Sequence, residues 1–288
     1  MGWQKVPFEQ INEYSAIPTS IDITTRVKKK TPASVMQEYE VEKWGGLKNL
    51  SKGLTLKGHH RLGEKAHAAA GDRLCFLEEE IFLASGYEIS CEYVSRLVTI
   101  LRQTYIKNNC NSIVELGVGY GRLLIPLMLS LGVEKVNKIH ALDYTDAALE
   151  ILKNVLRDST FDIDLRRIDL GKSILNQDLP ICDSNMRPLI FSSQALMYVP
   201  TLRPHFIDLM RNWHTGVFSF IEPSVFNLPN SSLKLLQERY IYLNDYNTNL
   251  GEMLTEASEK GFIKNLNIRA DILSENVFLP LQSFNWRF

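Results

Sequence analysis

Three glycines and a glutamate lie close together near the middle of the chain. In the segment VELGVGYGR, Glu115 stands two residues before Gly117, and Gly119 and Gly121 follow at alternate positions. Because they have no Cβ atom, Gly117 and Gly119 let the backbone pass close to a ligand. A phosphate group gains nothing from the nearby carboxylate, whereas a cationic amino group does. The segment therefore predicts a turn that binds an amino-acid-bearing nucleoside better than a pyrophosphate.

The same turn departs from the dinucleotide-binding fingerprint G-x-G-x-x-G. There the third glycine comes three residues after the second, and in this chain that position holds Arg122. An oxidoreductase with a nicotinamide cofactor is therefore an alternative that Arg122 disfavours. The turn follows the first strand of a series, so we expect it at the switch point of strand order, where α/β sheets bind ligands.

Two further acids follow the next strands of the series. Asp143 closes the segment HALD, and Asp169 closes RRID. With these acids, the turn resembles the first motif of the class I S-adenosylmethionine (SAM)-dependent methyltransferases over roughly residues 108–288. The resemblance implies SAM as the cofactor, with Asp143 holding the ribose hydroxyls and Asp169 contacting the adenine amino group. The expected cofactor-binding residues are Glu115, Gly117, Gly119, Gly121, Asp143, Tyr144, Asp169 and Ser193.

Several of these residues also have a purely structural interpretation. Asp143 could cap the helix that follows it, and Asp169 could be a turn residue before Gly171. Glu115 could be a solvated residue at a strand end. Tyr144 is placed to stack on the adenine, although a tyrosine at a strand end also serves packing.

After residue 108 the hydrophobic pattern alternates between strands and helices. Five apolar strands are expected at residues 112–117, 138–144, 161–170, 188–199 and 215–224. Strands that alternate with helices predict a parallel sheet covered on both faces. A helical stretch over residues 231–260 is expected to break near Asn247 and to stop at Gly261.

Two last strand-like runs, at residues 263–273 and 276–288, have little between them and predict a hairpin. The predicted fold is therefore α/β, with a seven-stranded, mostly parallel sheet, helices on both faces and an antiparallel last strand. The resemblance implies the same reversed seventh strand. We expect a SAM-binding Rossmann-like domain at residues 108–288, after an N-terminal arm and mainly helical lid at residues 1–107. Residues 1–58 show no sustained period, and helices are predicted around residues 76–82 and over 90–108.

A hydroxyl or amine acceptor must lose a proton during methyl transfer, which calls for a base. His60, Glu64 and His67 are spaced four and three residues apart, so they would share one face of a helix. We interpret His60 and His67 as candidate catalytic residues and His59 as a substrate contact, with a solvated or capping role as the alternative. A single E-x-x-H pair offers too few ligands for a metal, so none is expected.

The segments after the fourth and fifth strands supply the other candidates. Gln194 and Tyr198 in SSQALMYVP are expected to line the substrate pocket. Glu222 in FIEPS stands at the carboxyl end of a buried strand, where a carboxylate suits a substrate amine, guanidine or hydroxyl. We therefore interpret Glu222 as a candidate catalytic residue, with a structural role as the alternative.

Composition narrows the classes of function. The formal net charge of −1 gives no broad electrostatic footprint for nucleic acid or anionic membranes. The motif N-P-P-Y, typical of methylation at base or amide nitrogens, is absent. The four cysteines include no CxxC pair, the first ten residues contain no secretory apolar run, and no apolar run could span a bilayer. These features predict a cytoplasmic protein.

The sequence thus predicts a SAM-dependent methyltransferase that acts on oxygen, nitrogen or an acidic carbon of a small polar metabolite. One alternative is a protein or RNA methyltransferase that uses the N-terminal extension for recognition. Two others are a NAD-type oxidoreductase and a non-catalytic, methyltransferase-like partner subunit. The expected partners are a small-molecule substrate and, as an open alternative, a second copy of the chain in a homodimer.

Overall fold

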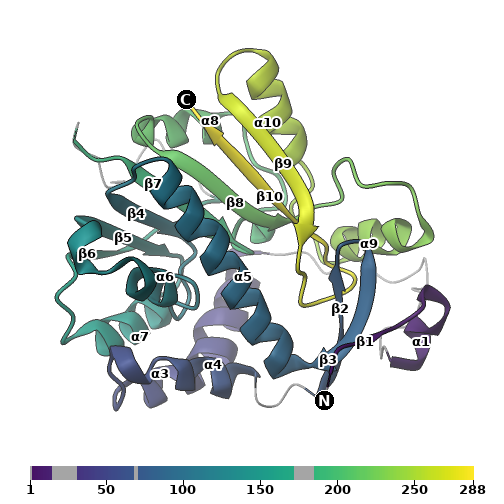
Figure 1. Ribbon diagram of the computed structural model, residues 1–288, viewed down its shortest axis with the longest axis horizontal. Helices are drawn as coiled ribbons and strands as arrows, with labels where there is room; N and C mark the ends of the chain where they lie inside the picture. The colour runs from purple at the N-terminus through teal and green to yellow at the C-terminus, as the bar shows by residue number, and fades with distance from the viewer. Residues whose placement is uncertain (1, 15–30, 68–70, 172–184) are drawn as a thin grey trace.

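The computed structural model describes residues 2–14, 31–67, 71–171 and 185–288. Its centre is a seven-stranded sheet with strand order β6-β5-β4-β7-β8-β10-β9 (Figure 1). The strands are β4 (Ser112–Leu116), β5 (Lys138–Asp143), β6 (Ile163–Arg167), β7 (Pro188–Ser193), β8 (Val217–Pro223), β9 (Lys264–Ile272) and β10 (Leu281–Arg287). The first strand of the series, β4, lies in the middle of the sheet, so strand order reverses beside it.

All strand pairs from β6 to β8 are parallel. β10 runs antiparallel to both of its neighbours, β8 and β9. It is held against β8 by aromatic packing: Phe284 is fully buried, and the Trp286 ring lies 4.7 Å from that of Phe220. The predicted seven-stranded sheet with an antiparallel last strand is confirmed.

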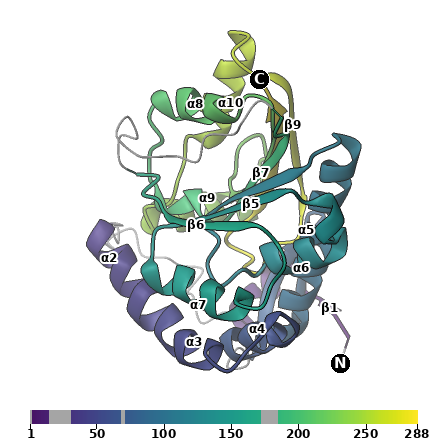
Figure 2. The same cartoon turned by 90° about the vertical axis from the view of Figure 1, so that its left-hand side faces the viewer.

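Helices cover both faces of this sheet, as Figure 2 shows. On one face pack α5 (Gly86–Lys107), α6 (Leu124–Leu131) and α7 (Asp146–Leu156). On the other pack α8 (His205–Met210) and α10 (Leu250–Glu259). The helical stretch predicted after residue 231 divides as expected, because α9 (Ser232–Leu243) ends before Asn247 and α10 is followed by Gly261 at φ 71°. Short 3-10 helices span Phe8–Gln10, Leu56–Gly58, Val133–Lys135, Leu196–Tyr198 and Arg211–Trp213.

The N-terminal part contains a second, three-stranded sheet where a helix was predicted. Strands β1 (Gln4–Lys5), β2 (Asp72–Leu77) and β3 (Glu80–Ser85) pair antiparallel in the order β1-β3-β2. The helix expected around residues 76–82 is therefore wrong. Glu78 and Glu79 form the hairpin turn with φ of 51° and 67°, a conformation that glycine and asparagine usually signal. Without that signal, the spacing of the apolar residues on either side of the turn resembles the spacing in a helix.

The β2–β3 hairpin packs onto the connection between β9 and β10. Phe76 and Ser274 exchange backbone hydrogen bonds of 3.0 and 2.8 Å. Val277 and Phe278 of the same connection pack with Leu74 and Phe76 in a separate small core, which also receives Ile11 of α1 (Ile11–Tyr14). This contact brings the connection between the last two strands towards the glycine turn after β4.

Residues 31–51, which we call the lid, are helical although the sequence shows no sustained period there. The lid consists of α2 (Pro32–Met36), a π-helix (Gln37–Lys43) and α3 (Trp44–Ser51). Together with α4 (His60–His67), it curves past α7 (Figure 2), and Asn154 of α7 donates a 2.9 Å hydrogen bond to Ser51. In the part of the chain that the structure describes, no helix has the length and apolar character needed to cross a membrane.

Candidate active site

A cavity of about 930 Å³ lies at the carboxyl ends of the central strands, beneath the lid. Its wall includes ten of the residues singled out from the sequence: His67, Glu115, Gly117, Gly119, Asp143, Tyr144, Asp169, Ser193, Gln194 and Tyr198. It also includes residues to which the sequence assigned no role in the site: Tyr39, Trp44, Arg73, Tyr93 and Tyr120. The cavity thus lies where the resemblance places the cofactor, and it extends towards α4 and α5.

The glycine turn forms one wall of the cavity with a left-handed backbone. Gly119 has φ of 54°, and its amide donates a 2.8 Å hydrogen bond to Oδ2 of Asp143. A Cβ atom on Gly119 would lie 3.2 Å from the ring of Trp44, so the lid packs directly on the turn. A side chain at this position would therefore be crowded. The absence of a Cβ atom on Gly119 also lets a ligand approach the backbone closely.

Gly121 has a different role from the one expected. It is not among the described residues that line the cavity. Its φ is 80°, and a Cβ atom there would lie 2.6 Å from Cδ2 of Leu152 on α7. The assignment of Gly121 to cofactor binding is therefore corrected: it allows the turn to pack against α7.

Two buried carboxylates, Glu115 and Asp143, lie side by side at the base of the turn. Their residues are only 3% and 7% exposed. Asp143 accepts hydrogen bonds from the Gly119 amide and from both the amide and the hydroxyl of Thr145, at 2.7 to 2.9 Å. Oε2 of Glu115 is buried and has no hydrogen-bond partner among the described residues. Asp143 therefore supports the turn, whereas Glu115 has one oxygen without a partner among the described residues.

The electrostatics of these two carboxylates favour a cationic ligand. Burial raises the pKa of Glu115 well above its usual value, and the charge of Asp143 raises it further. Burial also raises the pKa of Asp143, while the amides and hydroxyl that it accepts from oppose the rise. A cation bound beside them would stabilise both ionised forms. The turn and its acids thus fit the amino group of an amino-acid-bearing nucleoside.

Asp169 and Tyr144 line the same cavity beyond Asp143. Asp169 follows the end of β6 and accepts a 3.0 Å hydrogen bond from the Gly171 amide, so the turn role proposed for it is also present. The guanidinium of Arg167 lies 5.8 Å from the centre of the Tyr144 ring. The side chains of Asp169 and Tyr144 therefore each make a local structural contact, and both residues line the cavity.

The lid covers part of the cavity and is held there by three contacts. The hydroxyl of Tyr39 donates a short hydrogen bond to that of Tyr198 after β7. Trp44 packs on Gly119, and the carboxylate of Glu40 accepts a 2.9 Å hydrogen bond from the amide of Ala147 in the first turn of α7. A carboxylate at a helix N-terminus is favourable, because unpaired amides and the helix dipole both attract it. These contacts tie the lid to the ends of β4, β5 and β7.

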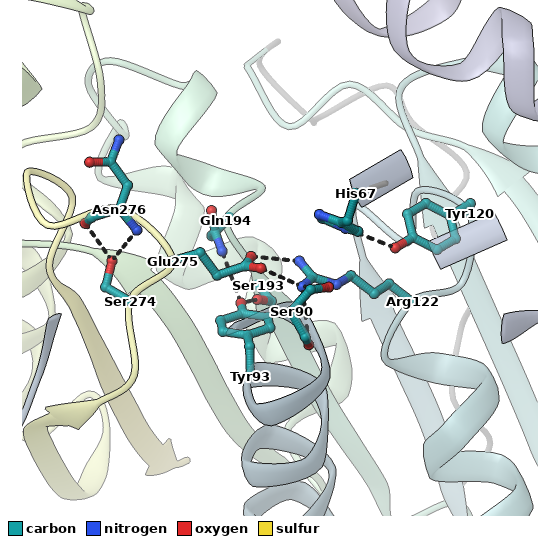
Figure 3. Close-up of polar contacts among 10 residues, drawn as sticks. All are labelled: His67, Ser90, Tyr93, Tyr120, Arg122, Ser193, Gln194, Ser274, Glu275 and Asn276. Carbon is teal, nitrogen blue, oxygen red and sulfur yellow. Dashed lines mark hydrogen bonds and ion pairs between the residues drawn. The ribbon is translucent and has the colours of Figure 1, made fainter. Parts of the chain in front are cut away.

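A hydrogen-bonded network forms the cavity wall towards α5 (Figure 3). The Tyr93 hydroxyl lies 2.5 Å from Oγ of Ser193 and accepts a 3.0 Å hydrogen bond from Nε2 of Gln194. The guanidinium of Arg122 lies 4.6 Å from the centre of the Tyr93 ring and donates two hydrogen bonds, of 2.6 and 2.7 Å, to Glu275. Tyr93 and Glu275 were not predicted as site residues, since neither lies near a recognisable motif in the sequence.

His67 lies at the end of α4 and faces this network (Figure 3), with its Nε2 3.5 Å from the hydroxyl of Tyr120. Burial lowers the pKa of His67 to about 4, and the positive charges of Arg122 and Arg73 contribute. His67 is therefore uncharged near neutral pH and can accept a proton. The structure places His67, unlike the two other candidate histidines, on the cavity wall.

Neither His59 nor His60 is among the described cavity-lining residues. His59 is buried, and its Nε2 lies 3.0 Å from the carbonyl oxygen of Tyr120 behind the turn. His60 is exposed, with Nδ1 3.2 Å from the carbonyl oxygen of Lys57. The expected substrate contact by His59 and catalytic role of His60 are corrected, because His59 is directed to the Tyr120 carbonyl and His60 to the Lys57 carbonyl, and neither lines the described cavity wall.

Glu222 supports the loop after β7. Its Oε1 accepts hydrogen bonds from the Ser192 hydroxyl at 2.7 Å and the Ala195 amide at 3.2 Å, and Oε2 accepts one from Met197 at 3.3 Å. Burial raises its pKa to about 7. The catalytic role expected for Glu222 is corrected, because the loop covers the carboxylate and separates it from the cavity. No group of three or more His, Cys, Asp or Glu among the described residues is placed to hold a metal ion.

The comparisons with known proteins give structural likenesses only. No protein-family model matches the chain, and no curated protein sequence matches it. The methyltransferase CalH in complex with S-adenosylhomocysteine (SAH) is similar, with a TM-score of 0.48 and 15% identity over 70% of this chain and 58% of that one. The chain thus matches little more than half the length of the CalH structure.

Two other solved structures show a likeness of the same degree. Magnesium protoporphyrin IX methyltransferase from Synechocystis PCC 6803, with bound SAH, has a TM-score of 0.43 and 10% identity over 70% of this chain and 85% of that one. The mitomycin 7-O-methyltransferase MmcR has a TM-score of 0.45 and 11% identity over 90% and 72% of the chains. The fold is decided by the strand order, the reversed β10 and the glycine turn after central β4. The chain has the class I methyltransferase fold.

Proposed function

We propose that the protein is a SAM-dependent methyltransferase that acts on a small polar molecule. The observation that carries the proposal is the buried pair of carboxylates at the glycine turn, of which Glu115 keeps one oxygen without a partner among the described residues. A buried carboxylate that is left unpaired is costly, so its presence on a cavity wall indicates a ligand that satisfies it. A ligand with an ammonium group does so.

The residues on the cavity wall fit the parts of SAM. Glu115 suits the amino group, and Asp143 suits a ribose hydroxyl, because its Oδ2 accepts a hydrogen bond from the Gly119 amide and can accept a further one. Asp169 and Tyr144 are available to the adenine, as the resemblance implies. When bound, SAM supplies an electrophilic methyl group on a positively charged sulfur.

The chain itself would position the acceptor, exclude water and accept a proton. The lid contributes Tyr39 and Trp44 to the cavity roof, which keeps solvent away from the reacting groups. His67 is neutral and half-buried on the wall, so it can take the proton that a hydroxyl or amine loses. A cavity of about 930 Å³ that the lid partly covers favours a small acceptor over a protein or RNA segment.

The first test is whether the folded protein binds SAH and does not bind NADH. We expect Glu115→Gln to weaken SAH binding by roughly 10-fold or more, because the amide removes a charged hydrogen bond worth about 1.5–3 kcal/mol. Isothermal titration calorimetry measures this, and transfer of a labelled methyl group into a metabolite extract then tests the reaction. The matched control is Glu134→Gln, in the short helix after α6 and outside the described cavity wall. Binding of NADH in place of SAH would contradict the proposal.

Binding of SAH is also expected to release protons. In the free protein the pKa of Glu115 is raised, so part of its population is protonated at a pH where an exposed glutamate is ionised. The ammonium group stabilises the carboxylate, so affinity should rise with pH through the free-protein pKa of Glu115 and fall below it. Calorimetry between about pH 5 and pH 8, in buffers with different ionisation enthalpies, measures the released protons. Affinity that is independent of pH over this range would show that no raised carboxylate binds the amino group.

A further inference from the structure

Four charged or titratable side chains meet on the acceptor side of the cavity, and we call them the arginine cluster: His67, Arg73, Arg122 and Glu275. They come from four separate segments, namely the end of α4, the start of β2, the glycine turn and the β9–β10 connection. Arg122 and Glu275 form a two-pronged ion pair whose side chains are 19% and 17% exposed. Their charges compensate each other, so the pair contributes little net charge to the cavity.

Arg73 supplies the uncompensated charge of the arginine cluster. It is exposed and lines the cavity, and within the described ranges it takes part in no ion pair. Arg73 and His67 line the same cavity, and the charge of Arg73 lowers the pKa of both His67 and Glu275. Besides the guanidinium of Arg73, the cluster has one more donor without an acceptor. This is the buried Nε of Arg122, which has no hydrogen-bond partner among the described residues. Two arginines and one glutamate therefore leave an excess of one positive charge beside neutral His67.

Charged side chains of both signs line the cavity. The acids Glu115, Asp143 and Asp169 come from the carboxyl ends of β4 and β5 and the segment after β6, on the side of the proposed cofactor. Arg73, Arg122 and Lys65 of α4 line the part of the cavity that includes His67. The other basic lining residues are Lys43 of the lid, which pairs with Glu38, and Arg203 before α8, and Glu42 of the lid is the remaining acid among the described lining residues. A cationic methyl donor suits the acidic side. The arginine cluster, with its excess of one positive charge, suits a ligand of the opposite charge.

We propose that the acceptor carries an anionic group, a carboxylate or a phosphate, which binds to Arg73 and places the acceptor atom beside His67. This inference rests on the proposed function, because it names the class of substrate for the same cavity. Guanidinium groups pair with carboxylate and phosphate oxygens in a planar, two-pronged geometry. Such an ion would balance the charge that Arg73 leaves uncompensated at the cavity mouth.

The bound anion would also improve His67 as a base. His67 is faced by Arg122 and Glu275 of the ion pair, by Arg73 and by the hydroxyl of Tyr120. Burial lowers its pKa most, and both arginines lower it further. An anion on Arg73 cancels one of these contributions, so the pKa of His67 rises towards the range where a base is most effective. By raising the pKa of His67, the substrate would therefore make this histidine a better acceptor for the substrate's own proton.

The test follows the titration of His67 by nuclear magnetic resonance in protein labelled at its six histidines. The signal of His67 is the one missing from His67→Gln. Sodium benzoate and sodium phosphate are added separately to SAH-saturated protein and compared with sodium chloride at equal ionic strength. We expect at least one anion to raise the pKa of His67 by about 0.5 or more. The two arms distinguish a carboxylate from a phosphate site.

The decisive variant is Arg73→Met, in which the pKa of His67 should be raised without any anion and should no longer respond to one. Arg61→Met, an exposed arginine on the same helix as His67 and outside the described cavity wall, is the matched control and should respond like the natural protein. An unchanged pKa with both anions, or an equal response in Arg73→Met, would overturn the inference. Failure of SAH to bind would instead count against the proposed function. The effect of the anions on the pKa of His67 can also be measured in the absence of SAH, so the two failures are distinguishable.

Labelled product provides a second readout. After methyl transfer from labelled SAM into a metabolite extract, the labelled compound should be retained by an anion-exchange resin, and phosphatase should release it only if the anion is a phosphate ester. Arg73→Met should lower the yield of retained product at least about 10-fold while SAH binding stays unchanged. Labelled product that passes through the resin would overturn the inference.

Discussion

Replacing Asp143 by asparagine is expected to weaken SAH binding by about 10- to 100-fold, the largest loss we expect from a change of one atom in this site. The carboxylate accepts hydrogen bonds on both oxygens, from the Gly119 amide on one side and from Thr145 on the other. An asparagine side chain has one acceptor and one donor, so its amino group must face either the Gly119 amide or the Thr145 amide. Two donors then meet in a buried place, and the turn loses either the contact that fixes Gly119 or the contacts with Thr145.

Calorimetry with SAH measures the loss, and circular dichroism checks that the variant remains folded. Asp146→Asn is the matched control, because Asp146 lies three residues further on, is exposed, and pairs with Arg167 at the protein surface. Asp146→Asn should bind SAH like the natural protein. SAH affinity within about 2-fold of the natural value in a folded Asp143→Asn variant would show that this carboxylate neither shapes the turn nor contacts the ligand.

The central sheet and the donor side of the site could be predicted because their signals are local in sequence. A buried strand, a glycine turn and an acid at the next strand end lie within about thirty residues, and the parallel register then brings these strand ends together. Glu115 and Asp143 meet for this reason, one on β4 and one at the end of β5. Gly121 was misassigned because its spacing does not reveal that the third glycine faces Leu152 of α7.

The acceptor side could not be predicted because its contacts join distant segments. Arg122 and Glu275 are 153 positions apart, and Glu275 approaches the turn only because the β2–β3 hairpin and the β9–β10 connection pack together. The hairpin turn at Glu78 and Glu79 lacks the residues that normally mark one. Glu222 has the position of a catalytic acid at a strand end, yet the following loop folds over it and uses both oxygens. A strand-end position alone therefore does not decide whether a side chain faces the cavity.

Glu275→Gln is expected to lower the free energy of unfolding by about 3 kcal/mol or more, the largest effect on stability that we expect from one substitution in this cluster. The variant leaves Arg122 charged and largely, though not fully, shielded from solvent, with a neutral amide in place of the carboxylate that accepts two of its hydrogen bonds. Urea unfolding followed by circular dichroism measures the change. Glu256→Gln, which breaks an exposed ion pair with Lys260, is the control and should cost no more than about 1 kcal/mol.

A double-mutant cycle separates the ion pair from the shape of the site. Combining Glu275→Gln with Arg122→Met removes the buried charge, so the double variant should lose clearly less stability than the sum of the losses in the two single variants.

The same pair makes stability depend on pH. Burial raises the pKa of Glu275, but the charge of Arg122 outweighs this and holds the pKa below its usual value. The pair therefore contributes its full stabilisation above the pKa of an unfolded glutamate and loses it as the pH falls through the lower, folded value. The natural protein should accordingly lose more stability than Glu275→Gln when the pH is lowered.

Two outcomes would show that Arg122 and Glu275 do not act as a pair. One is that the losses of the two single variants add up in the double variant, and the other is that the natural protein and Glu275→Gln are equally sensitive to acid.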